Sequence, residues 1–95
     1  MLIAGFEKIE KEIIGELHFP GEEVLLDKEQ IKQRAQDLSN ALSLGNLEHG
    51  KIKIYFEDDQ SCKVVETTVW GLTDKRVILK HGYGIPINRI HSVQI

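Results

Sequence analysis

The chain has 95 residues, of which 41% are hydrophobic and 28% are charged, with a formal net charge of −3. This length and composition are typical of one folded domain and exclude two independent cores or a disordered chain. There is no run of about 18 apolar residues and no basic, apolar leader at the start, so we expect neither a membrane span nor a secretory signal. Cys62 is the single cysteine, which suits a reducing compartment, and we expect a cytoplasmic protein.

The charges are unevenly distributed along the chain. Residues 1–30 carry eight acids and three bases, net −5, whereas residues 51–95 carry seven bases and five acids, net +2. Surfaces that follow nucleic-acid phosphates are normally far more basic, so we interpret the asymmetry mainly as a contribution to solubility. We expect one domain over residues 1–95, made of an acidic N-terminal segment (1–27), a helix (28–44) and an antiparallel β region (51–95).

The N-terminal segment fits two patterns. A helical spacing joins Phe6, Ile9, Ile13 and Leu17. A strand spacing joins Ile13, Gly15, Leu17 and Phe19, before the turn at Pro20-Gly21. A glycine costs a helix interior about 1 kcal/mol, so we predict a short helix over residues 6–14 and an extended piece after it. Whether residues 5–19 are helix or strand stays open at this point.

An amphipathic helix is predicted over residues 28–44. Its apolar stripe consists of Ile31, Ala35, Leu38 and Leu42. Asp27 is the expected N-cap, with Gln30 completing a variant capping box, and Leu26 is expected to pack on Ile31 as a hydrophobic staple. Gly45 is expected to end the helix in the left-handed conformation, followed by a loop through Gly50.

From residue 51 the hydrophobic period changes to two, which predicts strands. The expected strands are 51–56, a long one over 63–72, 76–80, and then 85–87 and 90–95, which form one bent strand or two short ones. Pro86 favours an edge or a break, with a 3₁₀ turn over residues 86–89. A polar turn at 57–61 sets Ile54 opposite Val65, and a two-residue turn at 73–74 sets Trp70 opposite Val77.

In this register both faces of the sheet are apolar, so each needs a cover. The helix supplies one cover. The second must come from closure into a small barrel, from the N-terminal segment, or from another subunit. We assign that second face as the candidate interaction surface, and its residues are Tyr55, Val64, Trp70, Val77 and Leu79.

The C-terminal third resembles known strand motifs. The pieces LTDKRVIL and IPINRIHSVQI are similar to strands of bacterial PH-like domains, and the order of one helix, five short strands and a 3₁₀ turn is similar to Sm-like small barrels, which assemble as rings and bind RNA. Taken whole, the chain resembles short uncharacterised bacterial proteins that end in V-E-T-T-x-W…I-P-I-x-R-I. That resemblance implies a bacterial source and carries no assigned activity.

The sequence offers little for catalysis, cofactors or metals. It contains no nucleophile elbow, P-loop or dinucleotide fingerprint. Cys62 has Lys63 as its one basic neighbour in sequence, and an acidic turn at 57–59 lacks the spacing of a calcium loop. The histidines show no metal-ligand spacing, and His81 and His91 are expected to lie far apart. We therefore expect no enzyme, no cofactor and no metal site.

Nucleic-acid binding is the alternative function. Basic residues gather in the β region together with Trp70 and Tyr83, a combination that base-stacking surfaces use. The candidate nucleic-acid residues are Lys63, Lys75, Arg76, Lys80 and Arg89. Membrane-surface binding, which the PH-like resemblance suggests, needs a basic loop cluster that is missing here.

Together these patterns predict an α+β fold, with the amphipathic helix packed on a C-terminal antiparallel sheet or small open barrel of four or five strands. The expected function is a non-catalytic cytoplasmic module of a bacterium, which binds a protein partner or a second copy of itself. The last strand, ending at Ile95, is a second candidate docking edge.

Overall fold

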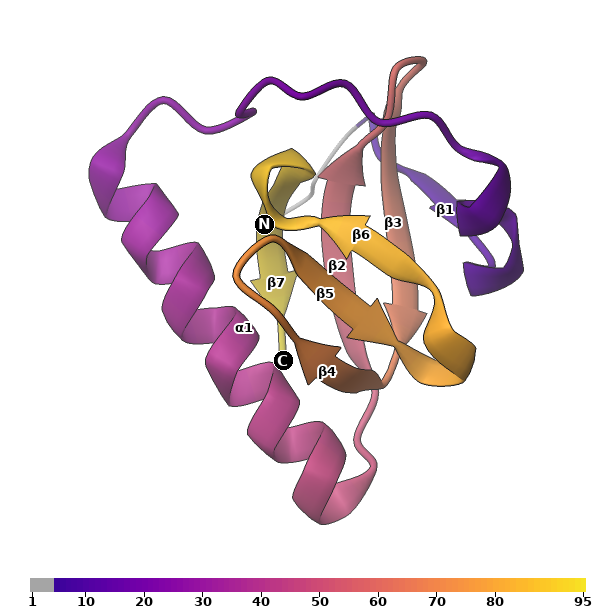
Figure 1. Ribbon diagram of the computed structural model, residues 1–95, viewed down its shortest axis with the longest axis vertical. Helices are drawn as coiled ribbons and strands as arrows, with labels where there is room; N and C mark the ends of the chain where they lie inside the picture. Colours follow the sequence, from indigo (N-terminus) through magenta and orange to yellow (C-terminus); the bar gives the residue numbers. More distant parts are fainter. Residues whose placement is uncertain (1–4) are drawn as a thin grey trace.

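The computed structural model describes residues 5–95 and has an α+β fold (Figure 1). In the labels below, η marks a 3₁₀ helix. The elements follow in the order β1 (Glu7–Ile9), η1 (Lys11–Glu16), α1 (Lys28–Glu48), β2 (Ile52–Glu57), β3 (Cys62–Thr67), β4 (Val69–Leu72), β5 (Arg76–Leu79), η2 (Lys80–Gly82), β6 (Gly84–Pro86), η3 (Ile87–Arg89) and β7 (Ile90–Gln94).

The strands form two sheets. Sheet A has four strands in the order β1-β3-β2-β7, and sheet B has three in the order β4-β5-β6. β1 pairs with β3 in parallel, and all other pairs are antiparallel. β3 runs into β4 across Thr68, but within residues 5–95 no strand pairing joins the two sheets. Of the alternatives that the sequence leaves open, closure into a small barrel therefore does not occur in the described part of the chain.

The core lies between the two sheets and is covered along one side by α1. The largest fully buried side chains come from both sheets and the helix, and they include Phe56, Leu38, Ile54, Leu79 and Ile85. α1 packs against β4 and β7, which are edge strands of sheets B and A (Figure 1). The helix therefore covers the opening that an unclosed pair of sheets leaves. Within the described residues, no helix is long and apolar enough to cross a membrane.

The N-terminal end of α1 follows the sequence prediction only in part. The backbone N–H of Glu29 donates to the Asp27 carboxylate at 2.9 Å, which confirms Asp27 as the N-cap. The predicted staple is wrong, because Leu26 is 96% exposed.

The C-terminal end of α1 lies beyond the predicted stop. Gly45 does not end the helix, which continues to Glu48 and is terminated by His49 in the left-handed conformation (φ 55°). Gly45 instead faces β4, where a Cβ atom would lie 2.2 Å from the carbonyl oxygen of Val69. The glycine is needed for close approach of the helix to the strand.

The predicted helix over residues 6–14 is wrong. β1 pairs with β3, with Ile9 opposite Val65, and the chain then makes η1. Ile9 and Ile14 are both buried. Pairing with β3 satisfies the backbone of residues 7–9 and buries Ile9, and η1 then buries Ile14, which together outweigh the local helical spacing.

The long predicted strand over residues 63–72 is divided at Thr68 into β3 and β4. The register of β2 with β3 is confirmed, with Ile54 opposite Val65. The predicted pairing of Trp70 with Val77 is wrong, because Val77 lies opposite Leu72 and the register shifts at Trp70 between Val69 and Gly71.

Turn chemistry explains the shifted register of β4 and β5. The Thr73 Oγ1 atom accepts hydrogen bonds from the backbone N–H groups of Lys75 (3.2 Å) and Arg76 (2.9 Å), and the Thr73 N–H donates to the Arg76 carbonyl (2.8 Å). These bonds pair Thr73 with Arg76 and centre the turn on Asp74 and Lys75, one residue later than predicted. Further along the chain, the 3₁₀ turn expected after Pro86 is present as η3.

Candidate functional site

The structure does not bring the five predicted interaction residues together. Val77 and Leu79 are fully buried in the core. Tyr55 and Val64 are opposite each other on the outer face of sheet A, whereas Trp70 is on sheet B with 51% of its surface exposed. The division into two sheets and the shift at Trp70 account for the separation.

Trp70 belongs to an uncovered outer face of sheet B, which we call the Trp70 face and define by Trp70, Gly71, Arg76, Ile78 and Gly84. Ile78 lies directly opposite Gly71 on one neighbouring strand and Gly84 on the other. Val77 and Leu79 point inward, so Arg76 and Ile78 point outward. Two glycines beside one isoleucine leave a surface with few side chains, next to the indole ring.

The Trp70 ring also contacts His81. The two ring centroids are 5.7 Å apart, and the ring planes meet at 75°, an edge-to-face arrangement. His81 itself has φ 70°, which turns the chain between β5 and β6. This contact holds the indole against the surface while half of it remains open to solvent.

Two of the five predicted nucleic-acid residues are structural. The Lys63 ammonium is buried and contacts the Asp58 carboxylate at 3.0 Å and the Ser61 hydroxyl at 2.7 Å. Arg89 is buried too, and its Nε donates to the carbonyl oxygen of Glu57 at 3.0 Å. Neither cation is free to bind phosphate.

The other three predicted cations, Lys75, Arg76 and Lys80, are exposed around β5. Arg76 belongs to the Trp70 face, and Lys75 and Lys80 are the residues just before and just after β5. The nearest acid in sequence is Asp74, which is also exposed. The strand β5 and its two ends therefore carry three exposed cations, while the acidic η1 packs beside the neighbouring strand β6.

Asp58 shows how the buried ion pair is held. Burial favours the neutral carboxylic acid, but the N–H groups of Ser61 and Gln60 and the Lys63 ammonium outweigh burial and lower the pKa of Asp58. The carboxylate also accepts from the backbone N–H of Ser61 at 2.9 Å and of Gln60 at 3.1 Å. The pair thus fixes the turn between β2 and β3.

A second cluster, which we call the Glu57 cluster, consists of Glu57, Cys62 and His91. The Glu57 carboxylate oxygen lies 2.9 Å from His91 Nε2 and 3.7 Å from Cys62 Sγ. One ligand-type atom from each residue lies within 4.8 Å of the other two. The residues come from the ends of β2 and β3 and from β7, and all three are partly buried.

Sequence spacing does not reveal this cluster, although part of it is implicit in the predicted register. Setting Ile54 opposite Val65 also sets Glu57 opposite Cys62, which the structure confirms. The pairing of β7 with β2 brings His91 next to Glu57, and the register of this pair is irregular between Tyr55 and Phe56. A search for histidine pairs close in sequence misses a site assembled from three strands.

The electrostatics of the Glu57 cluster do not favour a nucleophilic thiolate. Burial, and then the negative charge of Glu57, raise the pKa of the Cys62 thiol. The hydrogen bond from His91 is the main cause that lowers the pKa of Glu57. The Cys62 thiol donates to the Glu57 carboxylate, whereas nucleophilic catalysis needs a cationic or basic partner that stabilises the thiolate.

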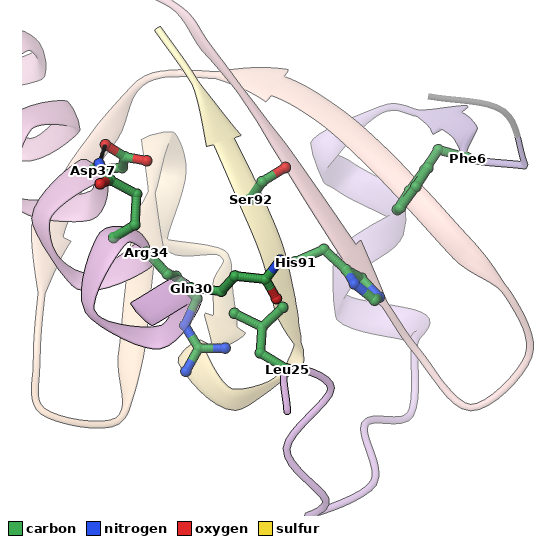
Figure 2. Close-up of a pocket in the computed structure, with 8 residues that line it drawn as sticks. Phe6, Leu25, Gln30, Arg34, Asp37, His91 and Ser92 are labelled. Carbon is green, nitrogen blue, oxygen red and sulfur yellow. Dashed lines mark hydrogen bonds between the residues drawn. The ribbon is translucent and has the colours of Figure 1, made fainter. Parts of the chain in front are cut away.

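A pocket of about 370 Å³ lies between α1 and β7, next to the same histidine (Figure 2). Its lining includes Leu25, Gln30, Arg34, His91 and Phe6. In Figure 2, His91 and Phe6 lie on the same side of β7, and their ring centroids are 5.6 Å apart in an edge-to-face contact.

Arg34, which lines this pocket, has a buried guanidinium group. Arg34 donates to both carboxylate oxygens of Glu23, at 2.6 and 2.7 Å, and to the carbonyl oxygen of Ile90 at 3.0 Å. The last contact joins α1 to the edge strand β7, so this edge is partly occupied by the protein itself.

Two features remain that offer groups to another molecule. The Trp70 face offers an exposed indole ring, and the Glu57 cluster offers three ligand-type atoms. Comparison with known proteins finds no matching family model, no matching curated protein and no matching solved structure.

Proposed function

We propose that the protein is a non-catalytic interaction module of the bacterial cytoplasm that self-associates through the Trp70 face. The observation that carries the proposal is the half-exposed Trp70 beside Ile78, which has a glycine on either side. Tryptophan and arginine are the residues most enriched at the energetic centres of interfaces, and both are present on this face.

A second copy of the chain offers a complementary surface. η1 presents Ile13, which is 40% exposed, among the exposed carboxylates of Glu10, Glu12 and Glu16. An apolar side chain surrounded by acids complements an indole surrounded by cations. η1 packs beside β6, so the two surfaces are neighbours on one molecule (Figure 1).

That adjacency suits a two-fold axis. In a two-fold dimer each surface meets the other surface of the partner, so the same pair of contacts forms twice. Two such contacts would cover Ile13 and Trp70 on both copies. The acidic N-terminal segment and the basic β region would then be used together.

The test is the solution mass by light scattering over a concentration series. Wild-type protein should show a dimer whose population rises with concentration, and Trp70→Ala and Arg76→Glu should both return it to monomer while circular dichroism shows an intact fold. Leu47→Ala is the matched control, because Leu47 is a large exposed apolar residue outside this face. A monomer at every concentration, or a dimer that Trp70→Ala leaves intact, contradicts the proposal.

Binding of single-stranded RNA is the second candidate, and a specific observation favours it. Lys75, Arg76 and Lys80 are exposed around the strand that borders Trp70, and stacking on an aromatic ring beside cations is how such strands are held. Trp70 is the single tryptophan of the chain, so its fluorescence reports directly on stacking. Quenching by a short oligonucleotide that weakens with salt and with Arg76→Glu would support this candidate, and unchanged fluorescence at low salt would remove it.

A further inference from the structure

The Glu57 cluster has the donor set of a transition-metal site. It offers a thiol sulfur, an imidazole nitrogen and a carboxylate oxygen, each from a different strand end. Zinc takes sulfur, nitrogen and oxygen ligands together and prefers four of them in a tetrahedron. Calcium and magnesium prefer oxygen alone, so this donor set selects against them.

The three atoms lie within 4.8 Å of one another, and two of their separations are close to those of such a centre. Zinc bonds of about 2.0–2.1 Å to nitrogen, 2.0–2.2 Å to oxygen and 2.3 Å to sulfur place neighbouring ligand atoms about 3.4–3.6 Å apart. The distance from Cys62 Sγ to Glu57 Oε1 is 3.7 Å, close to this value. The 2.9 Å hydrogen bond between His91 Nε2 and Glu57 Oε1 needs to open by about half an ångström, which a side-chain torsion can supply.

The neighbouring Arg89 contacts one oxygen of the Glu57 carboxylate and leaves the other one accessible. Arg89 Nη2 lies 3.7 Å from Glu57 Oε2, the oxygen that does not contact the thiol or the imidazole. Oε1 is thus the oxygen available to a metal. The His91 side chain is 28% exposed, which gives an ion access from solvent.

We propose that Glu57, Cys62 and His91 form a zinc site with three protein ligands, whose fourth position is taken by water or by a group from another molecule. On binding, the Cys62 thiol gives up its proton to solvent, and the His91 ring binds the metal through an Nε2 atom that carries no proton, with the ring proton on Nδ1. The metal would join the β2–β3 hairpin to β7 on the outer face of sheet A, on the side of the molecule away from the Trp70 face.

The experiment uses the untagged full chain after removal of metal. Zinc affinity is measured by competition with a chromogenic chelator, and Co²⁺ is added separately as a spectroscopic substitute. Wild-type protein should bind one Zn²⁺ per chain, and bound Co²⁺ should show tetrahedral visible bands with a thiolate-to-metal charge-transfer band. Cys62 is the single cysteine, so that band has one possible origin.

Cys62→Ser and His91→Gln should each weaken zinc binding by at least about 100-fold, the upper end of the loss found for outer-shell partners alone. His81→Gln is the matched control and should bind as the wild type does, because His81 contacts Trp70 and not the Glu57 cluster. The proposal is overturned if the wild type binds no zinc, if both ligand variants bind as tightly as the wild type, or if bound Co²⁺ shows no charge-transfer band. The Co²⁺ spectrum needs no variant, so the test stands even if a substitution prevents folding.

Discussion

Replacing Gly45 by alanine should destabilise the protein, although alanine is the better helix former. In an ordinary helix interior this change stabilises by about 1 kcal/mol. Here the new Cβ would lie 2.2 Å from the Val69 carbonyl oxygen, so α1 and β4 must move apart by about 1 Å to reach normal contact. Overpacking of this kind costs about 1–3 kcal/mol, and the obstacle is backbone, which cannot rotate away. A backbone obstacle places the cost in the upper part of this range, about 2–3 kcal/mol, and the gain of about 1 kcal/mol in helix propensity leaves a net loss of about 1–2 kcal/mol in the free energy of unfolding.

Urea unfolding followed by circular dichroism measures this loss. Asn46→Ala is the control, because Asn46 is the exposed neighbour on the same turn of α1 and should be neutral or slightly stabilising. For a domain of this size the expected loss corresponds to a fall of several degrees in the melting temperature, at about 4–8 °C per kcal/mol. If Gly45→Ala is as stable as Asn46→Ala, the close approach of helix and strand does not depend on the glycine and the reasoning fails.

Three further predictions concern the ion pairs and the helix start. Lys63→Met should lower the free energy of unfolding by about 3 kcal/mol in urea titrations, because it leaves Asp58 buried without its cation; a loss below 1 kcal/mol, as expected of an exposed pair, would contradict the geometry. The hydrogen bond from Arg34 is the main cause that lowers the pKa of Glu23, so this stabilisation is present above the ordinary value of 4.5 and is lost as pH falls through the lowered folded value. Arg34→Met should therefore flatten the dependence of unfolding free energy on pH below about 4.5, and an unchanged slope would refute the assignment. Leu26→Ser should change the free energy of unfolding by less than about 0.5 kcal/mol in thermal melts, because Leu26 is exposed; a larger loss would indicate that Leu26 packs on the helix as a hydrophobic staple after all.

What could be predicted from the sequence is what depends on neighbouring residues. The start of α1 is marked by Asp27 and is confirmed. The predicted stripe is confirmed only in part, because Leu38 is buried but Ala35 is exposed. The other buried residues of α1 are Arg34, Ala41 and Gly45. The pairing of Ile54 with Val65 follows from one short polar turn, and it is confirmed too. In each case the determining contacts lie within about a dozen residues, where the chain has few alternatives.

The features that could not be predicted depend on contacts between distant segments. The sequence around Gly45 predicts the end of the helix, because the close approach of β4 is not visible in it. In the N-terminal segment the helical spacing predicts a helix, but pairing with β3 makes residues 7–9 a strand. The pairing of β4 with β5 next to their turn depends on hydrogen bonds made by Thr73, and the register shifts again at Trp70, which changes which residues face outward. The candidate interaction surface was therefore divided, although Trp70 itself is exposed as an interaction residue must be.

The parallel pairing of β1 with β3 has a consequence for the order in which the protein folds. Glu7 pairs with Lys63, so this short strand closes a loop that contains α1, β2 and the turn that leads into β3. Closing so long a loop costs chain entropy, and only three residue pairs offset that cost. We therefore expect β1 to dock late in folding, onto a hairpin that has already formed. The same segment is then the first to open in the native state, and its amide hydrogens should exchange with solvent ahead of those in β2. Since β1 is an edge of sheet A, each opening briefly exposes the unpaired backbone of β3, and the protein's resistance to strand-mediated aggregation depends on how quickly β1 returns.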